Sequence, residues 1–200
     1  MWHDLELNGE FFLLLLEIDR QMAEQMRVAG CRCGGRLHRA DYPRKPRGVP
    51  QLTGRAYQWR ISFCCDRDGC RKRYTPTSVR FLGRRVYVAA IVVLACVREQ
   101  LQVTDTSAAD REQPVSKIPA PLAPRRTVMR WLKWWQMGFV QSALYAAARG
   151  RFVPPVCTEQ LPLSLLSRFL GTAADKLKAI LKWLSPLSTT TYRSGLPMVE

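Results

Sequence analysis

Two cysteine-containing stretches decide the fold of this chain: CRCGG at residues 31–35 and FCCDRDGC at residues 63–70. Thirty residues separate Cys33 from Cys64, so two close groups of thiols flank an insertion. A zinc ion takes four soft donors in tetrahedral geometry, and two turns joined by a short hairpin can supply them. Because the stretch has few apolar side chains of its own, we expect it to fold around Zn²⁺ as a ribbon.

The spacing indicates Cys31, Cys33 and Cys70 as zinc ligands, and either Cys64 or Cys65 completes the set. Both spacings, C-x-C and C-x4-C, depart from the usual C-x2-C. In the cytosol, clustered cysteines are more often metal ligands than disulfides. The alternative is that these residues are reduced thiols buried in a small core.

The choice between the two adjacent cysteines rests on a strand pattern. A period-two run of aromatic and branched residues predicts a strand: Tyr57, Trp59, Ile61 and Phe63. Cys65 continues this phase, whereas Cys64 falls on the opposite face. We therefore favour Cys65, and the predicted metal ligands are Cys31, Cys33, Cys65 and Cys70.

One histidine and two further cysteines lie outside the predicted ligand set. His38 could replace a thiolate, but an exposed loop histidine that faces a nucleic acid is the preferred interpretation. Cys96 and Cys157 lie in apolar surroundings and are expected in the core.

Outside the cysteine region the pattern is helical. Hydrophobic periodicity and end signals predict five helices, at about residues 10–29, 84–103, 125–139, 163–170 and 173–184. Residues 40–53 have turn chemistry and cations, which indicates an exposed basic loop. Residues 104–124 contain four prolines and are expected to form a linker, and the tail from Ser185 is expected to be loose.

These elements predict a mainly α fold with a small β zinc ribbon, of the α+β class. The composition, 47% hydrophobic and 24% charged, excludes disorder throughout. We expect four segments along the chain: an N-terminal helix (1–30), the zinc ribbon (31–82), a helix-turn-helix-like region (83–150) and C-terminal helices with a tail (151–200).

The net charge of +15 points to a polyanionic partner. Residues 27–85 hold sixteen basic and three acidic side chains, net +13, whereas residues 1–26 have a net charge of −5. On the predicted helix from residue 125, three cations recur on one face and apolar residues on another. The candidate nucleic-acid contacts are Arg44, Lys45, Arg47, Arg71, Lys72, Arg73, Arg126, Arg130 and Lys133.

No stretch is long enough to cross a membrane. The apolar runs at residues 11–16 and 86–97 contain six and twelve residues, against the roughly 20 that a spanning helix needs. Asp4, Glu6 and Glu10 occupy the place where a signal peptide carries positive charge. We therefore expect a cytoplasmic protein without a membrane partner.

One family resemblance emerges from the second cysteine stretch. The sequence RISFCC at 60–65 followed by CRKRYTPTSVRFL at 70–82 resembles the end of the N-terminal zinc ribbon of bacterial insertion-sequence transposases. In that family a cysteine knuckle precedes basic residues, an aromatic, a threonine-containing turn and a helix. Val115-Ser116 and residues 127–131 are similar to the turn and recognition helix of the helix-turn-helix that often accompanies such ribbons.

The resemblance does not extend to a nuclease. Such transposases cut DNA with three carboxylates that hold two magnesium ions. After Glu112 this chain has only Glu159, Asp175 and Glu200 as acids. The resemblance therefore implies a DNA-recognition region without an enzyme: an accessory factor, a regulator or a truncated transposase.

We consider three functions and expect none to be catalytic. The first is zinc-dependent, sequence-recognising binding of double-stranded DNA. The second is an RNA-binding or ribonucleoprotein module in which Tyr57, Trp59 and Phe63 stack on unpaired bases. The third is a helical adaptor for a separate catalytic subunit, such as a transposase or nuclease, and it is compatible with the first.

Overall fold

The computed structural model describes residues 2, 5–49, 54–83, 85–107 and 121–189. Backbone contacts group them into two compact units, described here one by one. The ribbon unit holds the described residues within 7–88 and 181–193, and the helical unit holds those within 1–6 and 89–180. Both units together are mainly helical with small antiparallel sheets, which confirms the predicted fold class. The division into four segments stays a prediction.

The ribbon unit begins with helix α1, Gly9–Ala29, as the periodicity predicts. The side chain of Asn8 caps its first turn by accepting a hydrogen bond from the backbone N–H of Phe11 at 2.9 Å. Gly30 ends the helix with φ 71°, a conformation that glycine adopts without strain. The helix thus delivers the chain directly into the first cysteine turn.

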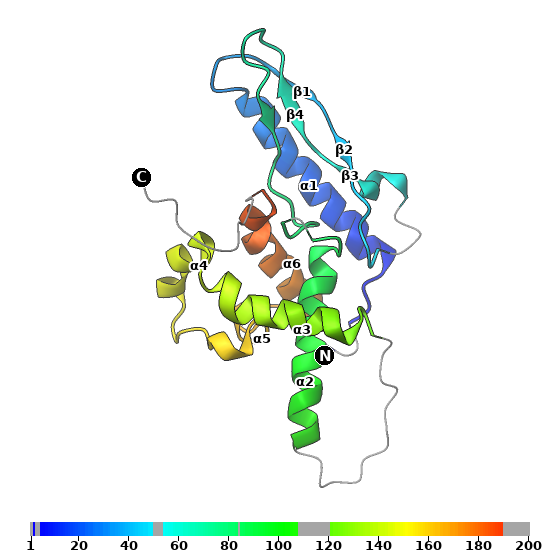
Figure 1. The fold of residues 1–200 in the computed structure, drawn as a ribbon, viewed down its shortest axis with the longest axis vertical. Coiled ribbons are helices and arrows are strands. Elements are labelled where there is room, and N and C mark those ends of the chain that lie inside the picture. The colour runs from blue at the N-terminus through cyan, green and yellow to red at the C-terminus, as the bar shows by residue number, and fades with distance from the viewer. Residues whose placement is uncertain (1, 3–4, 50–53, 84, 108–120, 190–200) are drawn as a thin grey trace. The chain divides into compact units, whose positions relative to one another are not determined.

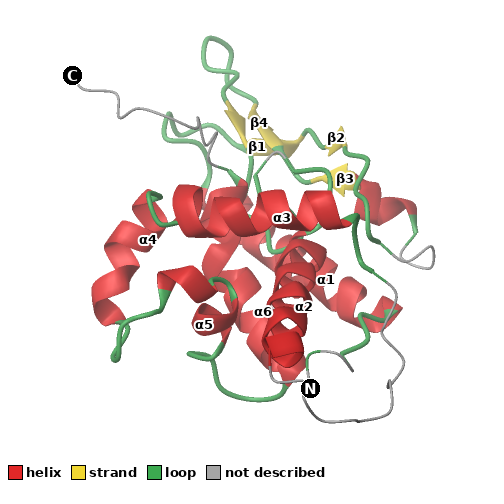
Figure 2. Cartoon of the chain, turned by 60° about the horizontal axis from the view of Figure 1, so that its bottom comes forward, coloured by secondary structure: helices red, strands yellow, loops and turns green. Residues whose placement is uncertain are grey.

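Five short strands follow in two antiparallel sheets (Figures 1 and 2). They are β1 (Leu37–Arg39), β2 (Tyr42–Pro43), β3 (Trp59–Arg60), β4 (Phe63–Cys65) and β5 (Arg73–Tyr74). One sheet has the order β1-β4-β5, and the other pairs β2 with β3. In the register of the first sheet Leu37 lies opposite Cys65, so strand pairing brings the two cysteine turns to the same end.

The single strand predicted from residue 57 to residue 63 is wrong. Arg55–Gln58 forms a 3₁₀ turn, and residues 61 and 62 separate β3 from β4. Within β3 the expected burial is inverted: Trp59 is 44% exposed and Arg60 is 1% exposed. The inward position suits Arg60 because its guanidinium donates to the carbonyl of Pro76 and lies over the ring of Phe81.

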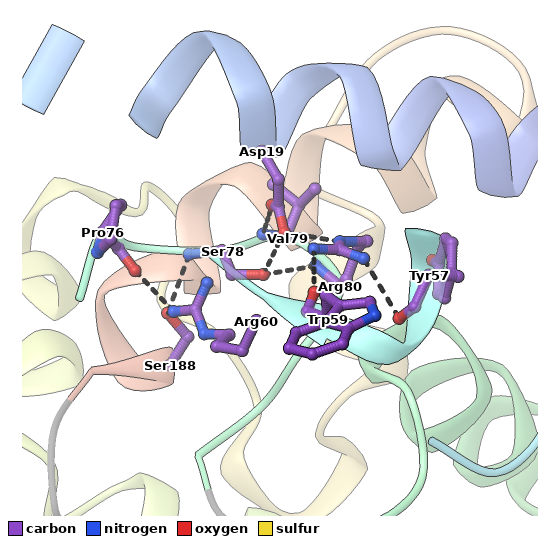
Figure 3. Close-up of polar contacts among 9 residues, drawn as sticks. All are labelled: Asp19, Tyr57, Trp59, Arg60, Pro76, Ser78, Val79, Arg80 and Ser188. Atoms are coloured by element: carbon purple, nitrogen blue, oxygen red, sulfur yellow. Dashed lines mark hydrogen bonds and ion pairs between the residues drawn. The ribbon is translucent and has the colours of Figure 1, made fainter. Parts of the chain in front are cut away.

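A buried ion pair ties α1 to the rest of the ribbon unit (Figure 3). Arg80 donates from Nε to Asp19 Oδ2 at 2.7 Å, and both side chains are buried. The backbone N–H of Val79 donates to Asp19 Oδ1 at 2.7 Å. Arg80 also donates to the carbonyls of Tyr57, at 3.2 Å, and Trp59, at 3.1 Å. Because the pair is hydrogen-bonded on all sides, it fixes three segments in one arrangement.

The loose tail predicted from Ser185 is wrong for residues 185–189. Ser185–Ser188 forms a 3₁₀ turn, and the side chain of Leu187 is buried. The hydroxyl oxygen of Ser188 accepts from the backbone N–H of Ser78 at 2.8 Å and from Arg60 at 3.3 Å. These long-range contacts hold the segment in place. The remainder of the predicted tail lies outside the described residues.

The helical unit contains α2 (Ala89–Ser107), α3 (Arg125–Lys133), α4 (Ala143–Ala148), α5 (Leu163–Leu166) and most of α6 (Ala173–Leu184). Helix α3 continues as a π-helical turn, Trp134–Phe139, so the predicted helix at 125–139 is present. It packs across α2 (Figure 1). Within the described residues of this unit, two 3₁₀ turns lie between these helices: Arg149–Arg151 and Thr158–Gln160.

The boundaries of two predicted helices, α2 and α5, differ from prediction. Helix α2 begins at Ala89 rather than residue 84, because Tyr87 and Val88 form β-bridges to Arg47 and Phe81. It also continues to Ser107, into the expected linker, whereas residues 108–120 lie outside the described part. Helix α5 stops early because the backbone amides of residues 168 and 169 bond three residues back rather than four. Among the described helices, none has the length and apolar character that crossing a bilayer requires.

Candidate metal centre

The first cysteine turn connects α1 to β1. Within it the backbone N–H of Cys31 donates to the carbonyl of Gly35 at 3.0 Å, and that of Gly34 donates to the carbonyl of Cys31 at 2.8 Å. Gly34 has φ 83°. A Cβ at Gly35 would lie 2.6 Å from Cys65 Sγ, so this position has no space for a side chain. The double glycine therefore closes the turn tightly against the second one.

The second cysteine turn connects β4 to β5. The backbone N–H of Cys65 donates to the carbonyl of Lys72 at 3.0 Å, and that of Cys70 donates to the carbonyl of Arg67 at 3.1 Å. Gly69, at φ 84°, and Arg71, at φ 43°, take left-handed backbone conformations inside this turn. The turn thereby bends the chain back so that Cys70 faces Cys65.

The two turns are joined by strand pairing and by polar contacts. The backbone N–H of Asp66 donates to the carbonyl of Arg36 at 3.0 Å, and its side chain accepts from the backbone N–H of Arg36 at 2.8 Å. The Arg67 guanidinium donates to the carbonyl of Cys33. Leu37 and Phe63 are buried beneath the turns in a small apolar core. The arrangement is thus held by the chain itself.

Four sulfur atoms converge where the turns meet. The Sγ atoms of Cys31, Cys33, Cys65 and Cys70 all lie within 4.8 Å of one another. The separations are 3.4 Å for Cys31–Cys33, 3.5 Å for Cys33–Cys65 and 3.7 Å for Cys31–Cys70. They exceed the ~2.05 Å of a disulfide bond, and all four cysteines are free thiols. The cluster is close enough to hold a metal ion.

Hydrogen-bond donors surround these sulfurs. A backbone hydrogen bond from Cys33, helped by the Tyr74 hydroxyl 3.3 Å away, lowers the pKa of the Cys31 thiol to about 6. The backbone N–H of Arg67 also lowers the pKa of Cys65, but burial and contacts with Cys33 and Cys31 outweigh it and raise that pKa to about 12. One thiolate therefore forms readily, and further thiolates in so small a volume need a cation among them.

Two neighbouring candidates lie outside the sulfur cluster. Cys64, the alternative ligand, directs its thiol to the carbonyl of Arg71 at 3.4 Å, as expected for the opposite face of the strand. His38 is exposed on β1, with Nε2 3.4 Å from Asp66 Oδ2. Of the two cysteines expected in the core, Cys96 is buried, whereas the prediction for Cys157 is wrong because its side chain is exposed.

The candidate nucleic-acid contacts of the ribbon unit differ in exposure. Arg71, Lys72 and Arg73 are exposed and run along the second cysteine turn into β5. In the expected basic loop Lys45 and Arg47 are exposed, and the backbone of Arg47 forms a bridge.

Arg44 is partly engaged inside the ribbon unit. Its guanidinium donates to the carbonyl of Arg85 at 3.1 Å and lies 5.2 Å from the ring centroid of Phe81. This half-buried side chain is therefore less available to a ligand than its two neighbours in the basic loop.

The three cations predicted in the helical unit are exposed on α3. Arg126, Arg130 and Lys133 face solvent, while Val128, Trp131 and Leu132 are buried on the other side. The helix therefore has the expected amphipathic character. Val115 and Ser116, the expected turn of a helix-turn-helix, lie outside the described residues.

Several site features were not anticipated from the sequence. The Tyr74 hydroxyl contacts Cys31 Sγ, although only its aromatic ring was noted in the motif. Tyr57 and Phe63, considered as stacking residues, are 1% and 3% exposed, and only Trp59 of that group reaches the surface. The exposure of Trp59 depends on long-range contacts that no local pattern reveals.

The fold and the cysteine cluster define a mainly helical protein with a small four-cysteine ribbon. No protein family, no curated protein and no solved structure matches the chain.

Proposed function

We propose that the chain is a zinc-dependent protein that binds double-stranded DNA. The carrying observation is the convergence of four sulfurs, one of them from Cys70, which directly precedes three exposed cations, Arg71, Lys72 and Arg73. In this proposal Zn²⁺ makes the turn rigid, so that its cations meet phosphate groups without first losing conformational freedom.

The sulfur geometry supports zinc as the ion. Zinc–thiolate bonds of about 2.3 Å in a regular tetrahedron place neighbouring sulfurs about 3.8 Å apart. Three sulfur–sulfur separations, 3.4–3.7 Å, lie near this value, and all four sulfurs lie within 4.8 Å of one another. Backbone donors to sulfur favour the charged thiolates that Zn²⁺ binds. Four thiolate ligands leave no open coordination position, which supports a structural metal and a non-enzymatic role.

The charge distribution supports a polyphosphate as the partner. The net charge of residues 27–85 is +13, and the run Arg71–Arg73 is exposed in the same segment as the metal ligands. Exposed cations of this kind release counterions when they bind phosphates, which makes affinity depend steeply on salt. The exposed face of α3 offers a second candidate contact, as in a helix placed in a groove. Recognition by such a chain would serve a separate transposase or nuclease subunit, or regulation alone.

The zinc site is tested by metal analysis of Cys70→Ser against the parent and against Cys64→Ser. We expect one zinc per chain in the parent and in Cys64→Ser, and a large loss of zinc in Cys70→Ser, because Cys70 belongs to the sulfur cluster and Cys64 does not. Equal zinc in all three proteins would remove the site.

DNA binding is tested by the salt dependence of duplex affinity. If Arg71 and Arg73 each contact a phosphate, replacing both with alanine lowers the slope of log K against log salt by about 2. Arg149→Ala with Arg151→Ala is the matched control, because these arginines have the same spacing and exposure in the helical unit. An unchanged slope in the first variant would place the contact elsewhere.

A further inference from the structure

The outward Trp59 and the inward Arg60 invert the usual placement of these residue types. A half-exposed tryptophan beside a fully buried arginine is informative, because burial normally favours the indole and opposes the guanidinium. The inversion is maintained by named contacts of Arg60 and is therefore built into the fold. An aromatic surface held outward in a basic protein is suited to a flat, apolar and partly charged ligand.

Trp59 lines a pocket of about 360 Å³ in the ribbon unit. This volume falls within the ~300–1,000 Å³ of typical small-molecule sites. Its polar rim includes Arg39 and Arg20, whose side chains are 68% and 54% exposed. The pocket also includes Asp41, which accepts from Arg39 Nε at 2.7 Å and from the backbone N–H of Ser62 at 3.0 Å. Asp41 thereby holds one guanidinium at the pocket edge.

The buried ion pair holds the backbone at Trp59 in place. Arg80 donates to the carbonyl of Trp59, and Asp19 holds Arg80 (Figure 3). On the neighbouring strand, Pro43 pairs with Trp59. The aromatic surface is thus attached to a rigid backbone, so that little conformational entropy is lost when a ligand binds.

We propose that this pocket takes one unpaired nucleotide of a DNA ligand, with the base stacked on Trp59 and a phosphate on Arg39. The inference rests on the proposed function, because the same ribbon unit would hold the flanking duplex. Stacking on an aromatic side chain needs an unpaired base. The guanidiniums of Arg20 and Arg39 can bind the phosphate group next to that base. The DNA bound best is therefore a duplex interrupted by an unpaired base.

The test measures affinity for three DNAs by fluorescence anisotropy: a blunt duplex, the same duplex with one bulged base, and one with an abasic bulge. Stacking of one base on an aromatic residue is worth ~1–3 kcal/mol, which is about 5- to 150-fold in affinity. We expect the parent to prefer the bulged base over the abasic bulge by at least about fivefold. Trp59→Ala removes this preference and Trp59→Phe keeps part of it.

Val86→Ala is the control, because Val86 is an exposed apolar residue of the same unit outside the pocket, and it should keep the full preference. Measurements of zinc content and melting temperature test whether the Trp59 variants are folded. Equal affinity for the base and the abasic bulge, or a preference that survives in Trp59→Ala, overturns the inference while duplex binding stands. Absence of salt-dependent binding to the blunt duplex overturns the proposed function itself.

Discussion

Adjacent glycines in the first cysteine turn offer a sharp test of the metal centre. Gly34 and Gly35 can each be replaced by alanine, so the same methyl group is added one residue apart. At Gly34 the new Cβ meets nothing within 4 Å, but φ is 83°. At Gly35 the Cβ would lie 2.6 Å from Cys65 Sγ and 2.9 Å from Asp66 Oδ1. One substitution strains the backbone and the other displaces a ligand.

The expected magnitudes follow from this difference. A left-handed conformation costs alanine about 1–2 kcal/mol relative to glycine, without touching the sulfurs. In Gly35→Ala, the methyl group and the Cys65 sulfur must move apart by about 0.8 Å to reach ordinary van der Waals contact. Metal–ligand distances tolerate about 0.2 Å. We therefore expect Gly34→Ala to lose stability with unchanged zinc affinity, and Gly35→Ala to lose at least about 10-fold in zinc affinity.

Competition with a chromophoric chelator at pH 7 measures the zinc affinity of the parent and of both variants. Urea unfolding of the zinc-loaded proteins measures the cost of backbone strain. Parental zinc affinity in Gly35→Ala would refute the sulfur arrangement, because the new methyl group and a bound Cys65 thiolate cannot share that space. An equal loss of zinc affinity in both variants would show that the turn as a whole, rather than the ligand sulfur, is sensitive.

Two further predictions concern stability. Arg80→Met leaves the Asp19 carboxylate buried without its cation, so we expect the free energy of unfolding in urea to fall by about 3–5 kcal/mol. The control is Arg39→Ala, at the more exposed pair with Asp41, which should lower it by less than about 1 kcal/mol. Similar losses in the two variants would contradict the buried pair. Hydrogen bonds from Thr172, followed by Lys178, lower the pKa of Asp175 from 3.8 to about 2. Its stabilising effect is therefore complete above about pH 4 and is lost as the pH falls through about 2. The melting temperature of Asp175→Asn should lie below that of the parent at pH 7, and the gap should narrow as the pH falls from about 4 to about 2; a gap of unchanged size at about pH 2 would contradict the assignment.

Much of the candidate metal centre could be predicted because its determinants are local. Ligand identity follows from thiol spacing, and the preference for Cys65 over Cys64 follows from strand alternation across a few residues. The collision at Gly35 could not be predicted, because it depends on a sulfur thirty residues away. The same holds for the Tyr74 hydroxyl, which reaches Cys31 only after β5 has paired with β4.

Five of the described α-helices were predictable from the sequence, whereas α4 was not predicted, and the helix ends depended on tertiary contacts. Helix α1 has its own cap and its own glycine stop, and both of its boundaries agree with the periodicity. The apolar run that contains the start of α2 begins at Val86, but Tyr87 and Val88 form β-bridges, so the helix begins only at Ala89. An apolar run therefore identifies a buried segment more reliably than it identifies the first helical residue.

The inverted pair in β3 shows why local patterns fail where distant side chains decide burial. Period-two alternation assigns the face of Trp59 to the core because it weighs only hydrophobicity. The interior of the ribbon unit instead accommodates two guanidiniums. Asp19, sixty-one residues before Arg80, supplies a charge to Arg80, whereas Arg60 donates to the carbonyl of Pro76 and to the hydroxyl of Ser188. Arg60 takes the inward position in β3, and Trp59, the other residue of this short strand, is the exposed one. Because Arg80 donates to the backbone carbonyl of Trp59, a variant that removes Arg80 should disturb the proposed base stacking at Trp59 as well as stability.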